Sequence, residues 1–195
     1  TPQDVPDVTD VVSLSAGGDT TCAVDENGSP WCWGSDAAGQ IGDGGGTPAA
    51  VPVPTRTTTT EDFISIAVGR AHTCGVDEDE AVWCWGSDSH GQLGDGGADT
   101  DQTAPVKVPG TSDLTLSISA GADSSCVVNG DGQAMCWGDN SDGQLGTGDK
   151  VDQSTPADVD QEAVSPSPLF AEILGTDRGM FYQVALGDGH ACGLE

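Results

Sequence analysis

The sequence predicts an all-β protein assembled from repeated units, of the propeller or solenoid type. Cys32, Cys84 and Cys136 lie 52 residues apart, each inside a stretch that ends in a glycine-rich turn. Glycine is abundant, with 29 among 195 residues, as tight turns between short strands require. Long helical patterns are absent, and repeats of about fifty residues typically form arrays of stacked units.

The repeats divide the chain into cores and connectors. Three complete units precede the front of a fourth, in which Cys192 follows Cys126 by 66 residues. We therefore predict one domain, 1–195, that is a partial array. The predicted repeat cores are 11–46, 63–97, 115–148 and 181–195. The predicted connectors, which contain proline and threonine, are 47–62, 98–114 and 149–180.

The front of each unit predicts a β-hairpin closed by a disulfide. A three-residue loop places Val24 opposite Pro30 and Cys22 opposite Cys32, close enough for a sulfur bridge. The same register pairs the other four cysteines as Cys74–Cys84 and Cys126–Cys136, and leaves Cys192 without a partner. Gly28 and Gly132 take the left-handed position of the loop. Glu80 stands there in the second unit, so that turn should be the most strained.

Zinc is the alternative use of these cysteines. The sequence contains no CxxC pair, and its three histidines, His72, His90 and His190, do not complete any set of zinc ligands. Three identical nine-residue gaps favour disulfides, which persist in oxidising places. The expected location is therefore extracellular, at the cell surface or periplasmic.

Tryptophans and aliphatic residues at repeated positions form the predicted core between units. These are Trp33, Trp85, Trp137, Ile41, Leu93 and Leu145. A platform on which sugars stack is the functional alternative for the tryptophans. We expect no cofactor. A calcium loop is an alternative at Asp43 and Asp95, but Thr147 interrupts that series in the third unit, which favours a structural turn.

The longest connector carries a cluster of apolar residues, namely Leu169, Phe170, Ile173 and Leu174. A segment that caps the edge of a unit is one interpretation. A loop that docks a partner is the other, because loops on a rigid scaffold often carry binding.

Charge excludes one class of partner. The chain has 32 acidic residues against 5 basic ones, a net charge of −27. Nucleic acid would be repelled, since its binding depends on lysine and arginine. Solubility in a salty habitat explains the acidity, with a basic partner or calcium as alternatives. No run of 18 apolar residues occurs, so insertion into a membrane is not expected.

The repeated pattern AGxDxTCAVDxxGxxWCWGSDxxGQLGDG resembles the repeat of the regulator of chromosome condensation (RCC1) family, in the cysteine-bearing form found in secreted bacterial proteins. The resemblance covers nearly the whole chain. It implies a β-propeller of four-stranded blades, commonly seven, closed by joining the ends of the chain. Members act as guanine-nucleotide exchange factors, as inhibitors of β-lactamases and as protein-binding platforms, and are mostly not enzymes.

The chain departs from that pattern in having too few units for a seven-bladed ring, with both ends cut inside a unit. Either it is a fragment of a longer chain, or another chain completes it. We expect a non-catalytic secreted or surface scaffold that binds a protein partner. The alternatives are a module that self-assembles by completing its broken blade and an enzyme carried on a propeller. GxSxG, HExxH and phosphate-loop motifs are absent.

Overall fold

The computed structural model describes residues 5, 7–46, 49–111, 115–159, 183–186 and 191–194, with the backbone alone for 183–185 and 191–194. All of the regular structure in these residues is β-strand. The strands form three four-stranded antiparallel sheets and one two-stranded sheet, as the repeats predict.

Each complete unit of the sequence folds into one blade. Blade 1 comprises β1 (Val11–Gly17), β2 (Thr20–Asp25), β3 (Pro30–Ser35) and β4 (Ala50–Arg56). Blade 2 comprises β5 (Phe63–Val68), β6 (His72–Asp77), β7 (Val82–Gly86) and β8 (Gln102–Lys107). Blade 3 comprises β9 (Thr115–Ala120), β10 (Ser124–Asn129), β11 (Ala134–Gly138) and β12 (Gln153–Asp158). A further hairpin pairs β13 (Gln183–Leu186) with β14 (Ala191–Leu194).

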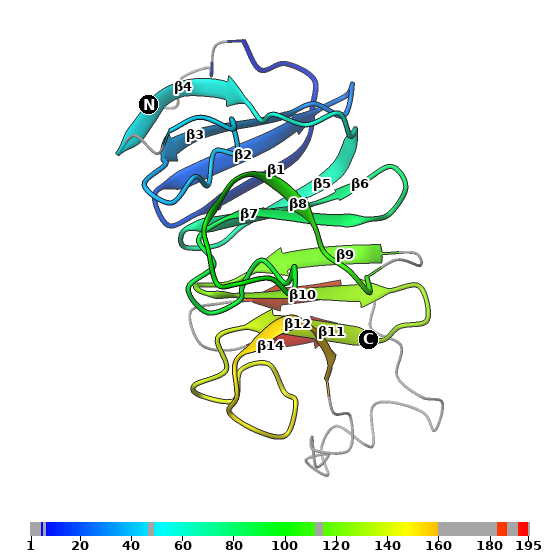
Figure 1. The fold of residues 1–195 in the computed structure, drawn as a ribbon. Helices are drawn as coiled ribbons and strands as arrows, with labels where there is room; N and C mark the ends of the chain where they lie inside the picture. Colours follow the sequence, from blue (N-terminus) through cyan, green and yellow to red (C-terminus); the bar gives the residue numbers. More distant parts are fainter. Residues whose placement is uncertain are drawn as a thin grey trace.

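The blades stack in sequence order (Figure 1). The first strands of successive blades, β1, β5, β9 and β13, lie next to one another along the stack. Within each blade the strands follow one another outward to β4, β8 or β12 at the far edge. This arrangement confirms the propeller architecture.

The fourth strand of each blade lies in a segment that the sequence analysis assigns to a connector. The connector prediction is therefore incomplete at 47–62, 98–114 and 149–180. These strands contain prolines, such as Pro52, and a sequence pattern with proline in its interior does not predict a strand. An edge strand tolerates proline because its outward N–H has no partner in the sheet.

The predicted hairpin register is confirmed. Cys22 pairs with Cys32 and Val24 with Pro30. The loop residues Gly28 and Gly132 have φ angles of 75° and 73°, and Glu80 adopts a φ of 64° at the same position.

Two of the three hydrophobic clusters among the described residues span neighbouring blades, and the buried members of the third all belong to blade 3. One cluster joins Ile41 of blade 1 to Phe63 and Trp85 of blade 2. A second cluster joins Leu93 of blade 2 to Trp137 of blade 3. Neighbouring blades therefore exclude water from each other's apolar side chains. Because of this mutual burial, we expect the blades to unfold cooperatively.

The part of the chain that the structure describes contains no helix long and apolar enough to cross a membrane.

Candidate functional site

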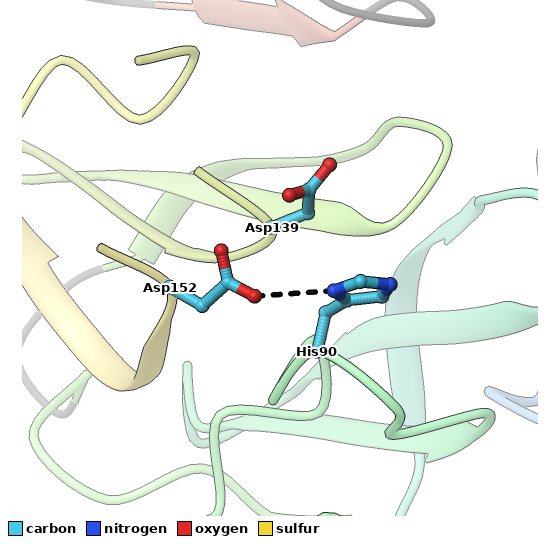
Figure 2. Close-up of side chains that lie close together, drawn as sticks. All are labelled: His90, Asp139 and Asp152. Atoms are coloured by element: carbon cyan, nitrogen blue, oxygen red, sulfur yellow. Dashed lines mark hydrogen bonds and ion pairs between the residues drawn. The ribbon is translucent and has the colours of Figure 1, made fainter. Parts of the chain in front are cut away.

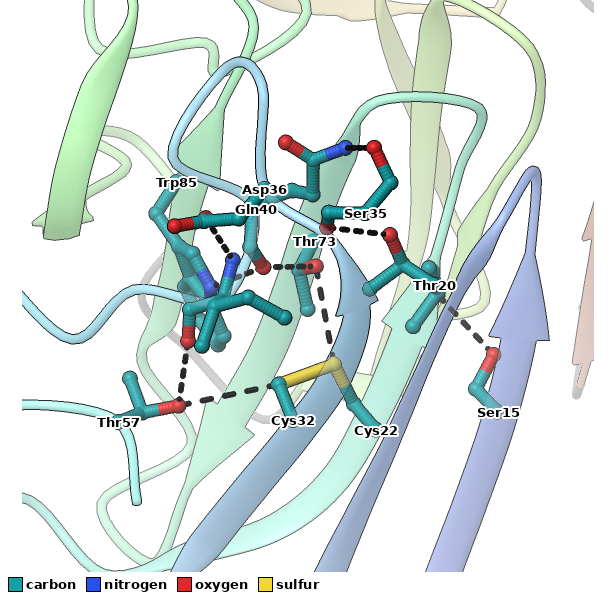
Figure 3. Close-up of a disulfide and its surroundings, with 12 residues drawn as sticks. Ser15, Thr20, Cys22, Cys32, Ser35, Asp36, Gln40, Thr57, Thr73 and Trp85 are labelled. Carbon is teal, nitrogen blue, oxygen red and sulfur yellow. Dashed lines mark hydrogen bonds between the residues drawn. A yellow bond between two sulfur atoms is a disulfide. The ribbon is translucent and has the colours of Figure 1, made fainter. Parts of the chain in front are cut away.

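The seam between two blades is built by one tryptophan and one glycine-rich turn. The indole Nε1 of Trp85 donates a hydrogen bond to the carbonyl oxygen of Gln40 at 2.9 Å, and Thr73 Oγ1 donates to the same oxygen (Figure 3). A Cβ at Gly42 would lie 2.6 Å from Trp85 Nε1, so only glycine admits the ring there.

The next seam repeats this geometry with Trp137. Its Nε1 donates to the carbonyl oxygen of Gln92 at 2.9 Å, and Ser125 Oγ donates to that oxygen at 3.0 Å. Trp85 and Trp137 are fully buried, as are Ile41 and Leu93, and Leu145 is 1% exposed. These five positions are core residues, so a sugar platform at Trp85 or Trp137 is ruled out by burial.

Trp33 differs from its two counterparts, because it is only partly buried. The described residues therefore do not bury Trp33 as completely as the core prediction expects. In blades 2 and 3 the preceding blade covers the equivalent tryptophan. No other described segment lies against this face of blade 1.

The strand beside Trp33 is uncovered in the same way. Leu14 is 66% exposed, whereas its counterpart Ile66 in blade 2 is 6% exposed. Val11 is 45% exposed, whereas the equivalent Phe63 is 1% exposed. We call the surface formed by Val11, Leu14 and Trp33 the open face of blade 1.

The three predicted disulfides are present as Cys22–Cys32, Cys74–Cys84 and Cys126–Cys136. Each joins the second and third strands of its blade, and all six sulfur-bearing residues are buried. The sulfurs also face the seams. Cys22 Sγ lies 3.8 Å from Thr73 Oγ1 of blade 2, and Cys74 Sγ lies 3.6 Å from Ser125 Oγ of blade 3.

His72 is sealed inside the seam between blades 2 and 3. Its Nε2 lies 2.9 Å from Ser125 Oγ, and its Nδ1 has no hydrogen-bond partner among the described residues. Burial and the nearby guanidinium of Arg70 lower the pKa of His72 to about 4. A neutral imidazole closed off from solvent does not meet substrate, so His72 is not placed for acid–base catalysis.

A small cavity of about 330 Å³ opens where the first strands of the blades end. Backbone atoms and small side chains line most of it, and Arg70 stands at its edge in an ion pair with Asp123. The lining residues carry no nucleophile paired with a base.

A cluster of three potential metal ligands, His90, Asp139 and Asp152, lies at the surface between blades 2 and 3 (Figure 2). His90 Nδ1 is 3.1 Å from Asp152 Oδ2, and one ligand atom from each of the three residues lies within 4.8 Å of the others. The main-chain N–H groups of Asn140 and Ser141 donate to the two carboxylates and orient them.

An imidazole with two carboxylates is a donor set that suits a borderline metal such as Zn²⁺. The sequence did not predict this trio, because the zinc-ligand sets considered there consisted of cysteines and histidines. Only the fold brings the two aspartates to His90. The seam between blades 1 and 2 has no such trio, since Ala38 stands at the position of His90 and Ser87 at that of Asp139.

The other candidates cannot be placed in a site. The apolar residues of the third connector and His190 lie outside the described residues, and of Cys192 only the backbone is described. Asp43 and Asp95 lie in equivalent turns, where the Oδ1 atom of each accepts a main-chain N–H, from Gly45 and Gly97 respectively.

Sequence models of one repeat family match the segments that form the blades. Two models described as the regulator of chromosome condensation (RCC1) repeat match the chain. The shorter matches residues 11–40, 63–92 and 116–144, and the longer matches 27–76, 79–128 and 131–194.

Curated relatives contain the same repeats within longer chains. The ultraviolet-B receptor UVR8 of Arabidopsis thaliana is 34% identical over 187 residues, which cover 93% of this chain and 42% of the relative. The X-linked retinitis pigmentosa GTPase regulator of Mus musculus is 34% identical over 149 residues, covering 76% of this chain and 15% of the relative. The chain thus spans less than half the length of these relatives.

Solved structures show the same fold. Prp20p from Saccharomyces cerevisiae has a TM-score of 0.80 at 20% identity, over 96% of this chain and 44% of that one. Human WBSCR16 has a TM-score of 0.77 at 22% identity, over 94% of this chain and 44% of that one.

Proposed function

Because this chain belongs to the RCC1-repeat family, we propose that it is part of a non-catalytic propeller scaffold whose role is to bind other proteins. The structural neighbour Prp20p was solved together with a study of its binding to Gsp1p and histones, and a further structure has Kap60 bound to yeast RCC1. Protein partners are therefore the class of ligand that this fold supports best.

The stack of RCC1-type blades is the observation that carries the proposal. In blade 1, Val11, Leu14 and Trp33 occupy positions that bury apolar surface in blades 2 and 3. The open face therefore suits either a further blade of the same polypeptide or the surface of another protein. In the covered seams the equivalent indole N–H donates to a main-chain carbonyl oxygen. A surface that covers Trp33 should therefore offer a hydrogen-bond acceptor to its indole N–H.

Photo-crosslinking from position 14 tests this surface. A crosslinking amino acid in place of Leu14, introduced into the protein in its native source, is expected to form an adduct. The mass of the adduct distinguishes a second protein, which supports binding at this face, from a further blade of the same polypeptide. Val12 is the matched control because it is 60% exposed and its counterparts Ile64 and Leu116 stay exposed inside the stack, at 47% and 48%. Equal labelling from both positions, or none from position 14, would contradict the proposal.

We also propose that the protein works in an oxidising compartment, as a secreted or surface protein. The three buried disulfides support this, since cytosolic reductants keep most thiols reduced. Acid-trapped protein from the native source, denatured and treated with a thiol-reactive polymer, is expected to show these six cysteines unmodified. Full modification without added reductant would place the protein in a reducing compartment.

Self-assembly is the second candidate, and the same open face favours it. A second copy could present a turn of the kind that receives Trp85, and so cover Trp33. Sedimentation of the purified chain over a range of concentrations is expected to show association that Leu14→Glu abolishes and Val12→Glu preserves. A monomer at every concentration would remove this candidate.

A further inference from the structure

One buried side chain closes the same turn in all three blades. The residues are Asp36, Asp88 and Asn140, which are 1%, 1% and 0% exposed. In each, the Oδ1 atom accepts the main-chain N–H of the core aliphatic residue five positions later, at 3.0 Å. This shared bond holds Ile41, Leu93 and Leu145 in the seams.

The other terminal atom of this side chain differs between blades. In blade 3 it is the amide nitrogen of Asn140, which lies 3.1 Å from Thr147 Oγ1 and from Val151 O. The same nitrogen is 3.1 Å from Asp149 Oδ1 and 3.2 Å from Asp149 O. A hydrogen-bond donor therefore sits among four oxygen atoms.

In blade 1 the equivalent atom is a carboxylate oxygen. Asp36 Oδ2 is buried and has no hydrogen-bond partner among the described residues. Thr147 of blade 3 is replaced in this turn by Asp43, a second acid. Burial, together with the charge of Asp43, raises the pKa of Asp36. Negative charge thus gathers where blade 3 has a donor, and an uncompensated buried charge is costly.

Blade 2 has the same substitution. Asp88 replaces Asn140 and Asp95 replaces Thr147, while Asp99 lies on the following loop. Burial first, and then the charges of Asp95 and Asp99, raise the pKa of Asp88 to about 6. The main-chain N–H of Thr100 acts in the opposite direction by hydrogen bonding to the Asp88 carboxylate. Among the described residues, Asp36 Oδ2 is therefore the one terminal atom of these three side chains that is left without a partner.

We propose that the turn of blade 1 binds a divalent cation, Ca²⁺, between Asp36 and Asp43. The cation takes the place that the Asn140 amide occupies in blade 3. Both side-chain donors are carboxylates, which suit a hard cation such as Ca²⁺ and not a thiophilic one. Binding would secure the turn that carries Gln40, whose carbonyl oxygen accepts the indole N–H of Trp85.

Asparagine is the discriminating substitution, because the protein itself uses it at the third position. Asn keeps the Oδ1 acceptor for the main-chain N–H and removes the charge, so Asp36→Asn and Asp88→Asn should fold without Ca²⁺. Calorimetric titration with CaCl₂ in 150 mM NaCl, a salt concentration of the order that screens exposed charges, measures the site. The wild-type chain is expected to bind about one Ca²⁺ with a rise in Tm, Asp36→Asn none, and Asp88→Asn still about one.

Asp79→Asn/Asp131→Asn is the matched control, since it removes two exposed carboxylates and leaves the turn of blade 1 intact. It should still bind about one Ca²⁺ and keep the rise in Tm. The proposal is overturned if millimolar Ca²⁺ neither binds nor raises the Tm of the wild-type chain, or if the Asp36→Asn variant binds as much as wild type. Loss of binding on Asp139→Ser alone would also overturn it, by assigning the ion to the trio of Figure 2. None of these outcomes depends on a protein partner.

Discussion

Glu80 shows how a single residue can depart from an otherwise regular repeat. Its backbone has a φ of 64°, in the left-handed region that the equivalent Gly28 and Gly132 occupy without strain. An L-residue with a Cβ pays roughly 1 kcal/mol or more for this conformation. The sequence alone predicts this strain, because the loop length fixes which residue must take the left-handed position.

Replacing Glu80 by Gly should stabilise the protein by about 1 kcal/mol, since relief of the left-handed strain outweighs the added freedom of the unfolded chain. Urea unfolding followed by tryptophan fluorescence measures the change. The reverse substitution, Gly132→Ala, should destabilise by a similar amount. A destabilised Glu80→Gly variant would contradict the prediction.

His72 makes stability depend on pH. Its pKa is lowered to about 4 in the folded chain, against 6.5 for an ordinary histidine, so the unfolded chain takes up the proton first. The stability that the neutral imidazole confers is therefore complete above pH 6.5 and is lost as the pH falls towards 4.

The expected loss from His72 is about 2 kcal/mol of unfolding free energy between pH 7 and pH 5. Thr20 occupies the same position in blade 1, so His72→Thr is the matched variant. Subtracting its pH dependence from that of wild type isolates the contribution of His72. Identical pH profiles for the two proteins would show that His72 is not sealed.

At the scale of the element, the seam matters more than the blade. A blade offers little apolar surface of its own, and its disulfide pins only one hairpin. The tryptophans of blades 2 and 3 are each buried by the turn of the blade before them. A tryptophan at this repeated position therefore contributes a different amount to the free energy of unfolding in different blades.

Trp85→Phe should destabilise by about 2 kcal/mol, because it removes the bond to the Gln40 carbonyl and leaves space around the smaller ring. Trp33→Phe should cost less than about 0.5 kcal/mol, because that side chain is partly exposed at the open face. Unfolding in urea compares the two variants. Equal losses would mean that Trp33 is covered in solution, as self-assembly requires.

At the scale of the whole molecule, charge opposes compactness. The chain carries −27, and Arg70–Asp123 is the only ion pair of a lysine or arginine with a carboxylate among the described residues. Repulsion between unpaired carboxylates destabilises the folded state and is screened by salt.

Raising NaCl from 20 mM to 1 M should therefore raise the Tm by several degrees, since the Debye length falls from roughly 20 Å to 3 Å. Calorimetry in the presence of EDTA measures this without a contribution from divalent cations. A Tm that falls with added NaCl would show that favourable ion pairs outweigh repulsion.

The 52-residue spacing was enough to predict the blades, the hairpin register and the cysteine pairs, because these depend on contacts close along the chain. The same reasoning missed β4, β8 and β12, since edge strands accept prolines that a strand pattern excludes. It also treated Trp33 as equal to Trp85 and Trp137, although burial depends on the neighbour and not on the residue.

By itself the sequence determined the repeat, the turns and the family, since each is written in short-range spacing. Only the tertiary structure decided which atoms meet across seams. It brought Asp139 and Asp152 to His90, buried Asp36 Oδ2 without a donor, and left Leu14 uncovered. Contacts between residues about fifty positions apart depend on how blades stack, and no local pattern encodes that.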